Sequence, residues 1–365
     1  ATLDTMEREL PAIEMSNTDE DNSEFAAGFW LQYRLVTNRV FKQYWRTPFY
    51  LWSKFFVVIY TEIFIGFTFF KANHTLQGLQ NQMFAVFMFT VLFNPFLQQY
   101  LPIFTAQRDL YEARERPSRT FSWLSFILGQ MSAEFPCNFL AGAVAFFCFY
   151  YPVGLYSNAS FSNQLAERSG LFFLYSVAYF IWIGSMSSMV AAPFDDPQAG
   201  GNVANLMFTM SIMFNGVFVG PSKMPGFWKF MYRVSPLTYF IDGTLSTAIA
   251  NNNVQCSTKE LSALTPPSGM TCGEYLDPYF KNVGTGYLTD YNATDVCHVC
   301  SMSTTNYYLK TVSSSYSHRW RNFGIFLAFI AFDYAMTIFL YWYARVPKKA
   351  NRVAEERDPS KSETK

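Results

Sequence analysis

The chain has 365 residues, and its 27 basic and 27 acidic side chains give a formal net charge of zero. Half of the residues are hydrophobic, 19% are aromatic and only 15% are charged, whereas roughly one quarter are charged in a soluble domain. This composition excludes an ordinary soluble globular protein and predicts an all-α polytopic membrane protein. The zero net charge hides an uneven distribution of charges and gives no indication of a nucleic-acid partner.

The N-terminal segment, residues 1–28, is predicted to be an acidic linker. Its acidic side chains far outnumber its single base, Arg8, and it has few apolar residues with which to form a core. It lacks the basic start and apolar centre of a cleaved signal peptide.

Residues 29–47 are predicted to form a connecting helix along the cytosolic membrane surface. Apolar side chains recur there every three to four residues, among them Tyr33, Val36 and Val40, while Arg39 and Arg46 share another face. A span follows at once, which favours an interfacial helix over one that packs on a soluble domain.

Six apolar stretches are long enough to cross a bilayer as helices. The third is longer than the ~20 residues that a span needs, and we expect it to be kinked or broken near Pro136. An even number of spans places both termini on the same side. The predicted spans are residues 49–70, 83–104, 121–153, 171–192, 201–219 and 323–343, within membrane regions 48–220 and 322–345, and residues 346–365 form a tail.

A dense charge cluster, residues 107–119, separates the second and third spans and sets the orientation. Its arginines favour the cytosolic side. Residues 111–115 contain no helix breaker and Pro117 follows, which predicts a short charged helix suited to contact with a soluble partner. Bases near the first span and after the sixth, such as Lys54 and Arg345, fall on the same side, but the turn at residues 193–197 carries no base.

Three glycosylation sequons begin at Asn73, Asn158 and Asn292. All three fall on the side that the charge distribution predicts to be external, where such sites can be modified. This agreement supports the topology with both termini in the cytosol and predicts a glycoprotein.

A long external segment, residues 221–321, is predicted between the fifth and sixth spans. Residues 225–242 are amphipathic and aromatic and are interrupted at Ser235 and Pro236. We expect two short helices that dip into the outer leaflet. A seventh span is disfavoured, because charges such as Arg233 and Asp242 are costly at membrane depth.

Four cysteines follow in the same external segment. An external location favours two disulfides, for which three pairings are possible. The alternative is a zinc site, since the last two cysteines have the CxxC spacing. We favour disulfides and expect no metal; Cys137 and Cys148, in the third span, are predicted core residues. The four external cysteines are Cys256, Cys272, Cys297 and Cys300.

The sequence shows no motif of a known catalytic site, and we expect no catalytic residue in this chain. The sequence contains no GxxxxGK[S/T] loop for phosphate, and no Ser/His/Asp arrangement stands out. Glu62, Glu134 and Asp333 are ionisable groups at membrane depth, and such groups are functional candidates that face a cavity or one another. For Glu134, beside Pro136, the alternatives are a cap on a half-helix or a pair with a cytosolic arginine.

Two stripes, one in the second span and one in the fifth, combine aromatic rings, methionine and small polar groups at helical spacing. Such surfaces suit bulky amphipathic ligands, because soft side chains repack at little cost and few donors require a matching acceptor. Ordinary helix packing is the alternative. The predicted substrate path consists of Phe89, Phe93, Asn94, Met207, Phe208, Ser211, Asn215 and Phe218.

Five strings stand out in a fixed order: QGLQNQ at residues 77–82, FNPFLQQYLP at 93–102, QRDLYEARERPS at 107–118, YRVSPLTY at 232–239 and TPPSG at 265–269. With them the chain, from residue 29 to 349, resembles the second membrane domain of the fungal pleiotropic drug resistance ABC transporters. The resemblance implies six transmembrane helices of the ABCG-like ABC exporter type, with a disulfide-linked extracellular cap between helices five and six.

The resemblance also implies partners. Two nucleotide-binding domains, which hold ATP and Mg²⁺, would drive drugs, sterol-like molecules or lipids outward across the plasma membrane through two six-helix domains. No cofactor is expected in this chain itself. In such transporters the turn between the second and third spans is a coupling helix that relays nucleotide-domain motion. The corresponding residues here are Asp109, Glu112, Arg114, Glu115 and Arg116.

The sequence departs from the family pattern at Glu62 and Asp333, where neutral amides are usual, and at residues 193–197. We favour the membrane domain of an ATP-driven multidrug exporter. The alternatives are a truncated or assembly-only membrane protein without transport, and a membrane enzyme that uses Glu62 or Asp333.

Overall fold

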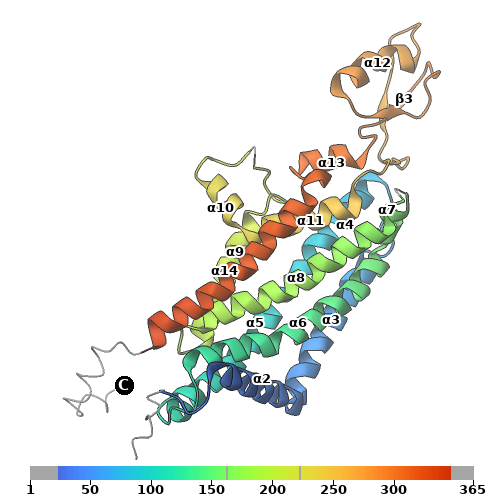
Figure 1. Cartoon of the computed structure of the whole chain (residues 1–365). Helices are drawn as coiled ribbons and strands as arrows, with labels where there is room; N and C mark the ends of the chain where they lie inside the picture. Colours follow the sequence, from blue (N-terminus) through green and yellow to red (C-terminus); the bar gives the residue numbers. More distant parts are fainter. Residues whose placement is uncertain (1–23, 162, 222, 347–365) are drawn as a thin grey trace, which may run out of the picture.

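The computed structural model describes residues 24–161, 163–221 and 223–346. Most of the predicted acidic linker and nearly all of the predicted tail lie outside these residues. The described chain is mostly helical, and its long helices share one axis (Figure 1). Helix α2 and the C-terminal end of α14 lie at one end of this axis, and the segment that contains α12 and β3 lies at the other.

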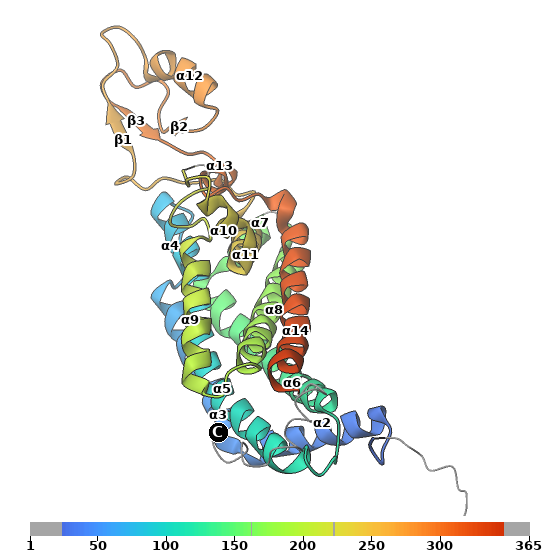
Figure 2. The ribbon, with the colours of Figure 1, turned by 90° about the vertical axis from the view of Figure 1, so that its left-hand side faces the viewer.

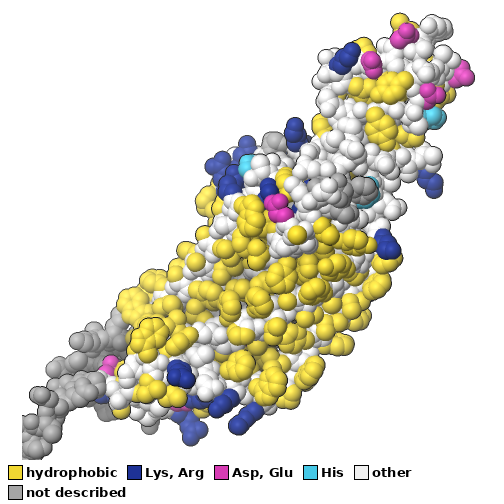
Figure 3. Space-filling model, turned by 45° about the vertical axis from the view of Figure 1, so that its right-hand side comes forward, with side chains coloured by type: hydrophobic (Ala, Val, Ile, Leu, Met, Phe, Trp, Pro, Cys, Tyr) yellow, Lys and Arg dark blue, Asp and Glu magenta, His cyan; other side chains and the backbone are white. Residues whose placement is uncertain are grey.

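Five helical segments among the described residues are long and apolar enough to cross a membrane. Their side chains form a broad hydrophobic surface between the two ends of the molecule (Figure 3). The chain is therefore a multi-pass membrane protein. The segments contain α3 (Pro48–Thr68), α4 (Leu76–Met88) with α5 (Phe93–Leu110), α6 (Trp123–Val153), α8 (Leu165–Ala191) and α14 (Arg319–Arg345).

Prolines affect two of these segments differently. A short 3₁₀ turn, η1 (Phe89–Leu92), separates α4 from α5. Pro95 follows this turn; it has no N–H to donate, and its ring crowds the carbonyl of Val91 four positions earlier. Helix α6, in contrast, continues through Pro136 without a break, so a half-helix that ends there is not present. Proline is tolerated inside such helices where neighbouring helices cover the freed carbonyl.

The predicted fifth span corresponds to α9 (Pro197–Met213), a helix of 17 residues that is shorter than the five segments above. Asp196 caps its N-terminus, because the carboxylate accepts from the backbone N–H groups of Gln198 and Ala199 at 3.2 and 3.3 Å. The prediction that the helix extends to residue 219 is wrong. Gly216 has a φ of +91°, which a helix does not allow, and Asn215 Oδ1 accepts from the N–H of Val217 at 2.9 Å.

Helix α2 (Phe29–Arg46) buries one residue per turn, and these residues face α6. A Cβ added at Gly129 of α6 would be 2.7 Å from Val36 Cγ1, so the two helices need a glycine there. Helix α8 is the central helix and contacts α5, α6, α11 and α14. The backbones of α8 and α6 lie close together at Gly142 of α6, where a Cβ would be 2.6 Å from Val177 Cα.

The end of the molecule opposite α2 contains the short helices. Ser235 separates α10 (Trp228–Val234) from α11 (Pro236–Ile249), so the predicted pair of short helices is present. Helix α11 is mostly buried against α8 and α14. The remaining short helices are α7 (Leu155–Phe161), α13 (Thr305–Thr311) and the 3₁₀ turn η3 (Tyr316–His318).

Beyond these helices, residues 253–304 form a small cap at the far end of the axis (Figure 2). It contains α12 (Cys272–Val283) and an antiparallel sheet of β1 (Ser262–Leu264), β2 (Tyr287–Leu288) and β3 (Cys297–Cys300), in the order β1-β3-β2. The all-α prediction is therefore wrong in this segment, because its extended strands pair with one another.

Two disulfides, Cys256–Cys300 and Cys272–Cys297, connect the cap. The CxxC cysteines of β3 thus pair with two different partners, and the zinc alternative is excluded for all four. The second bond lies in a small core of its own with Leu276, Leu288 and Val299. Cys137 and Cys148 are free, the first buried and the second half-buried.

Candidate functional site

The charged turn, residues 107–119, continues directly from α5. After Leu110 the backbone widens into one π-helical turn, η2 (Tyr111–Glu115), in which the N–H of Arg116 donates to the carbonyl of Tyr111 at 2.8 Å. The ring of Tyr111 stacks on Phe126 of α6 with centroids 4.7 Å apart. Pro117 then has no N–H with which to continue the helix, so the turn is fixed on α6 and ends where the sequence predicts.

One face of the charged turn binds the ends of other helices. Glu115 forms an ion pair with Arg39 of α2. Glu112 accepts from Tyr341 Oη at 3.1 Å and from Arg345 Nη1 at 3.3 Å, both in α14. Arg116 donates to the carbonyl of Arg345 at 2.7 Å. Three of the five predicted coupling residues, Glu112, Glu115 and Arg116, are thus already engaged within this chain.

Arg108 connects the charged turn to the C-terminal end of α8. Its guanidinium is completely buried and donates to the carbonyls of Ala191, Phe194 and Asp195 at 2.9, 2.5 and 3.0 Å. These carbonyls have no helical partner, and a cation at a helix C-terminus is favourable. Arg345 adds an ion pair to Asp195 at 2.6 Å. The turn after α8, which has no base of its own, therefore receives two arginines from elsewhere.

The opposite face of the charged turn points outward. Asp109, Leu110, Ala113 and Arg114 are all exposed, and they follow helical spacing. Among the described residues Arg114 takes part in no ion pair. Asp109 forms an ion pair with the neighbouring Arg108 at 3.2 Å and has no other ion-pair partner among the described residues. This outward face therefore combines an apolar side chain with one acid and one base that are available to a partner.

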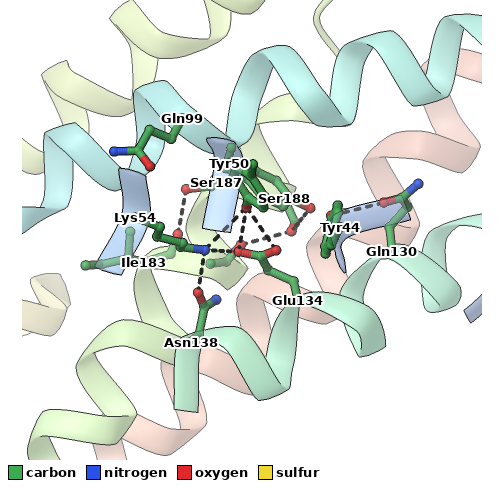
Figure 4. A network of polar contacts seen from close by, with 12 residues as sticks. Tyr44, Tyr50, Lys54, Gln99, Gln130, Glu134, Asn138, Ile183, Ser187 and Ser188 are labelled. Atoms are coloured by element: carbon green, nitrogen blue, oxygen red, sulfur yellow. Dashed lines mark hydrogen bonds and ion pairs between the residues drawn. The ribbon is translucent and has the colours of Figure 1, made fainter. Parts of the chain in front are cut away.

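A second polar cluster lies inside the helix bundle (Figure 4). Lys54 of α3 and Glu134 of α6 form an ion pair, with side chains only 1% and 4% exposed. Lys54 Nζ also donates to Asn138 Oδ1 at 2.8 Å, and Tyr50 Oη donates to the two Glu134 oxygens at 3.0 and 3.1 Å. A Cβ at Gly184 of α8 would be 2.2 Å from Asn138 Nδ2, so three helices meet at this cluster.

Sequence reasoning missed this cluster. Lys54 was assigned to the cytosolic flank, and neither alternative for Glu134 is present. The available signal was the spacing: Tyr50 and Lys54, like Glu134 and Asn138, are four residues apart and share a helix face.

The other two carboxylates predicted at membrane depth lie apart from this cluster. Glu62 of α3 is completely buried, and neither of its oxygens has a hydrogen-bond partner among the described residues. Asp333 of α14 is buried as well and accepts from Ser185 Oγ at 3.2 Å.

The predicted substrate-path residues divide between four environments. Phe89 and Phe93 are core residues, and Phe93 stacks on Phe208 with centroids 4.1 Å apart. Asn215 is buried in the turn after α9. Asn94 and Phe218 are exposed. Met207, Phe208 and Ser211 line a cavity.

The sequence model of the ABC-2 type transporter family matches residues 31–249, and that of the CDR ABC transporter family matches residues 285–358. The chain is 58% identical to the ATP-dependent permease PDR10 of Saccharomyces cerevisiae, over 96% of this chain and 22% of the permease. It is 56% identical to the pleiotropic ABC efflux transporter of multiple drugs PDH1 of Candida glabrata, over 97% of this chain and 23% of that transporter.

The chain thus spans less than a quarter of the length of these relatives. The matches confirm the resemblance to the pleiotropic drug resistance transporters, and they cover the bundle, the charged turn and the last helix. The chain belongs to the ABC-2 type transporter family.

Proposed function

We propose that this chain is a six-span membrane domain of an ATP-driven exporter of bulky amphipathic compounds, among them drugs, lipids and sterols. Relatives whose names describe efflux of multiple drugs support this proposal. In the complete transporter, nucleotide-binding domains hold ATP and Mg²⁺, and a second six-helix domain completes the path.

We infer a topology in which α9 is the fifth span and both termini are cytosolic at the plasma membrane. The position of α2 and the end of α14 at the same end of the bundle supports it (Figure 1). So does the cap at the opposite end, because its disulfides are typical of an oxidising compartment. Helix α9 is short, but 17 residues at 1.5 Å each give about 25 Å, close to the ~30 Å of a hydrocarbon core.

The proposed role in energy coupling rests on the two different faces of the charged turn. Its inner face holds α2, α14 and the turn after α8, while its outer face leaves Asp109, Leu110 and Arg114 for a nucleotide-binding domain. A force on this outer face acts on several helices at once, because ion pairs and hydrogen bonds connect them. That arrangement suits a relay between ATP hydrolysis and the spans.

The exposed face of α5 and α9 is the proposed wall of the substrate path. Asn94 and Gln98 of α5 and Asn202 and Thr209 of α9 are exposed polar residues on these two helices. Polar groups at membrane depth face a cavity or protein rather than lipid. We therefore assign this face to the second membrane domain and to a substrate path between the two.

The experiment changes Arg114 to glutamate in the full-length transporter and measures efflux of an uncharged lipophilic dye together with ATP hydrolysis. We expect the ratio of dye exported to ATP hydrolysed to fall by about tenfold, since a reversed charge at a contact both repels and leaves the partner unpaired. Lys42→Glu is the matched control, because Lys42 is exposed in α2 at the same end but outside the turn. An unchanged ratio in Arg114→Glu would contradict the relay.

A further inference from the structure

A cavity of about 350 Å³ lies between α8, α9, the junction of α10 and α11, and α14. Figure 2 looks onto α9, α8 and α14, with α10 and α11 above them. Helix α9 packs on α5 and α8, whereas α14 packs on α8 and α11, so the cavity occupies the space between α9 and α14. Its volume is in the range of sites for drug-sized molecules.

Five methionines line the cavity: Met186 and Met189 of α8, Met207 and Met210 of α9, and Met231 of α10. Methionine is unbranched and polarisable, so such a wall adapts to ligands of different shape. Four aromatic rings complete the wall, including Trp182 and Phe332. Phe332 and Met210 are 57% and 40% exposed, which places the opening of the cavity on the apolar outer surface.

A single carboxylate, that of Asp333, belongs to this mostly apolar wall, in which Ser211 and Ser235 are the other polar side chains. Asp333 is only 5% exposed, and Ser185 Oγ donates to its Oδ2 at 3.2 Å. No ion pair among the described residues includes Asp333. Glu134, another buried carboxylate of the bundle, has Lys54 as its countercharge.

A carboxylate in this environment is complementary to a cation that none of the described residues supplies. A buried charge is costly unless it is paired. An ammonium group that enters from the apolar side would pair with the carboxylate and would also be attracted by the faces of the surrounding rings. The methionines would then enclose the apolar part of the same molecule.

We propose that this cavity binds lipophilic amines, with the ammonium group on the Asp333 carboxylate and the apolar body among the methionines. The site lies on the flank of α9 that faces α8 and α14, away from the exposed polar residues of α5 and α9. The inference rests on the proposed export function and adds a class of substrate to it.

The test uses the full-length transporter in nanodiscs of phosphatidylcholine, a lipid without net charge. The probes are dansylcadaverine, a lipophilic primary amine, and its uncharged N-acetyl derivative, whose dissociation constants are measured by dansyl fluorescence. We expect the amine to bind more tightly than the amide. Asp333→Asn should weaken binding of the amine by about tenfold or more, because its countercharge is removed, and leave binding of the amide within about twofold.

Two further variants locate the site. Met189→Trp should weaken binding of both probes, since Met189 is buried in the cavity wall. Glu62→Gln is the matched control, because it neutralises a buried carboxylate that does not line the cavity, and both dissociation constants should stay unchanged.

The proposal is overturned if Asp333→Asn leaves the affinity for the amine unchanged or lowers both affinities equally. Should Asp333→Asn fail to fold, tight binding of the amine to Met189→Trp would overturn it as well. Binding is measured without ATP, whereas export is measured separately as efflux of the uncharged dye. Failure of the amine-binding proposal can therefore be distinguished from failure of the proposed export function.

Discussion

Lys54 of α3 and Glu134 of α6 are 80 residues apart in the chain, yet they form an ion pair in the interior of the helix bundle. Tyr50 and Asn138 complete its hydrogen bonds. The pair joins the first and third predicted spans at one point, because each charge is stable there only in the presence of the other.

Removal of one member of this ion pair should destabilise the fold more than removal of both members. Lys54→Met leaves the Glu134 carboxylate buried without a countercharge, a loss that typically costs about 3–5 kcal/mol. The double variant Lys54→Met with Glu134→Leu leaves no charge buried and should recover most of this loss. Thermal unfolding of the purified full-length protein measures both. A double variant as unstable as the single one would show that the charges are not coupled.

Arg108 should matter for stability rather than for partner contact. Arg108→Met leaves the carbonyls of Ala191, Phe194 and Asp195 without their donors, and an unsatisfied buried group costs about 1–3 kcal/mol. We expect a lower melting temperature and faster amide exchange at the start of α9. Arg114→Met, an exposed neighbour in the same turn, is the control and should unfold at the wild-type temperature.

The three sequons should not be equivalent. Asn158 is only 1% exposed and its Nδ2 donates to Gln82 Oε1 at 2.9 Å, so the atom that would carry a glycan is engaged. Asn292 is exposed on the cap. Asn292→Gln should therefore remove a glycan that endoglycosidase treatment detects as a mobility shift, whereas Asn158→Gln should not. Absence of any glycan at Asn292 would count against an external cap.

Contact between the cap and α4 should depend on pH. Burial raises the pKa of Glu260, but hydrogen bonds from the N–H groups of Gln77 and Ser257 outweigh this effect, and the pKa is held below its ordinary value of 4.5. An acid with a lowered pKa stabilises the fold above its ordinary pKa, and the contribution is lost as the pH falls through the lower folded value.

We therefore expect the backbone amide of Gln77 to lose protection from hydrogen exchange as the pH falls below about 4.5. The measurement is amide hydrogen exchange, corrected for the intrinsic rate at each pH. In Glu260→Gln the protection should be lower at neutral pH and should no longer change over this range. Equal protection in variant and wild type at pH 7 would contradict this role of Glu260.

Much of the helical framework could be predicted from the sequence. The apolar stretches identified the long helices, and Ser235 and Pro236 identified the boundary between α10 and α11. The predicted secondary structure is wrong where the local backbone geometry differs from what the apolar composition indicates. Apolar residues continue past Met213, yet Gly216 and Asn215 end the helix. The strands of the cap are too short, two to four residues, to give a periodic signal.

The candidate sites could be predicted only in part. The charged turn is contiguous in the chain, so its residues were identified together, but their division into an inner and an outer face was not. In the sequence, Glu112 and Glu115 cannot be distinguished from the exposed Asp109. They belong to the inner face only because the fold places Arg345 beside Glu112 and Arg39 beside Glu115.

By itself the sequence determined the membrane class, the family and the local helices, because hydropathy, proline and charge act over a few neighbouring residues. Tertiary structure decided which charges meet: Lys54 with Glu134, Arg108 with the end of α8, and Cys256 with Cys300. It also placed Asp333 beside a cavity, with no countercharge among the described residues. The physical reason is that pairing depends on distance in space, and helix packing brings together residues that sequence spacing keeps far apart.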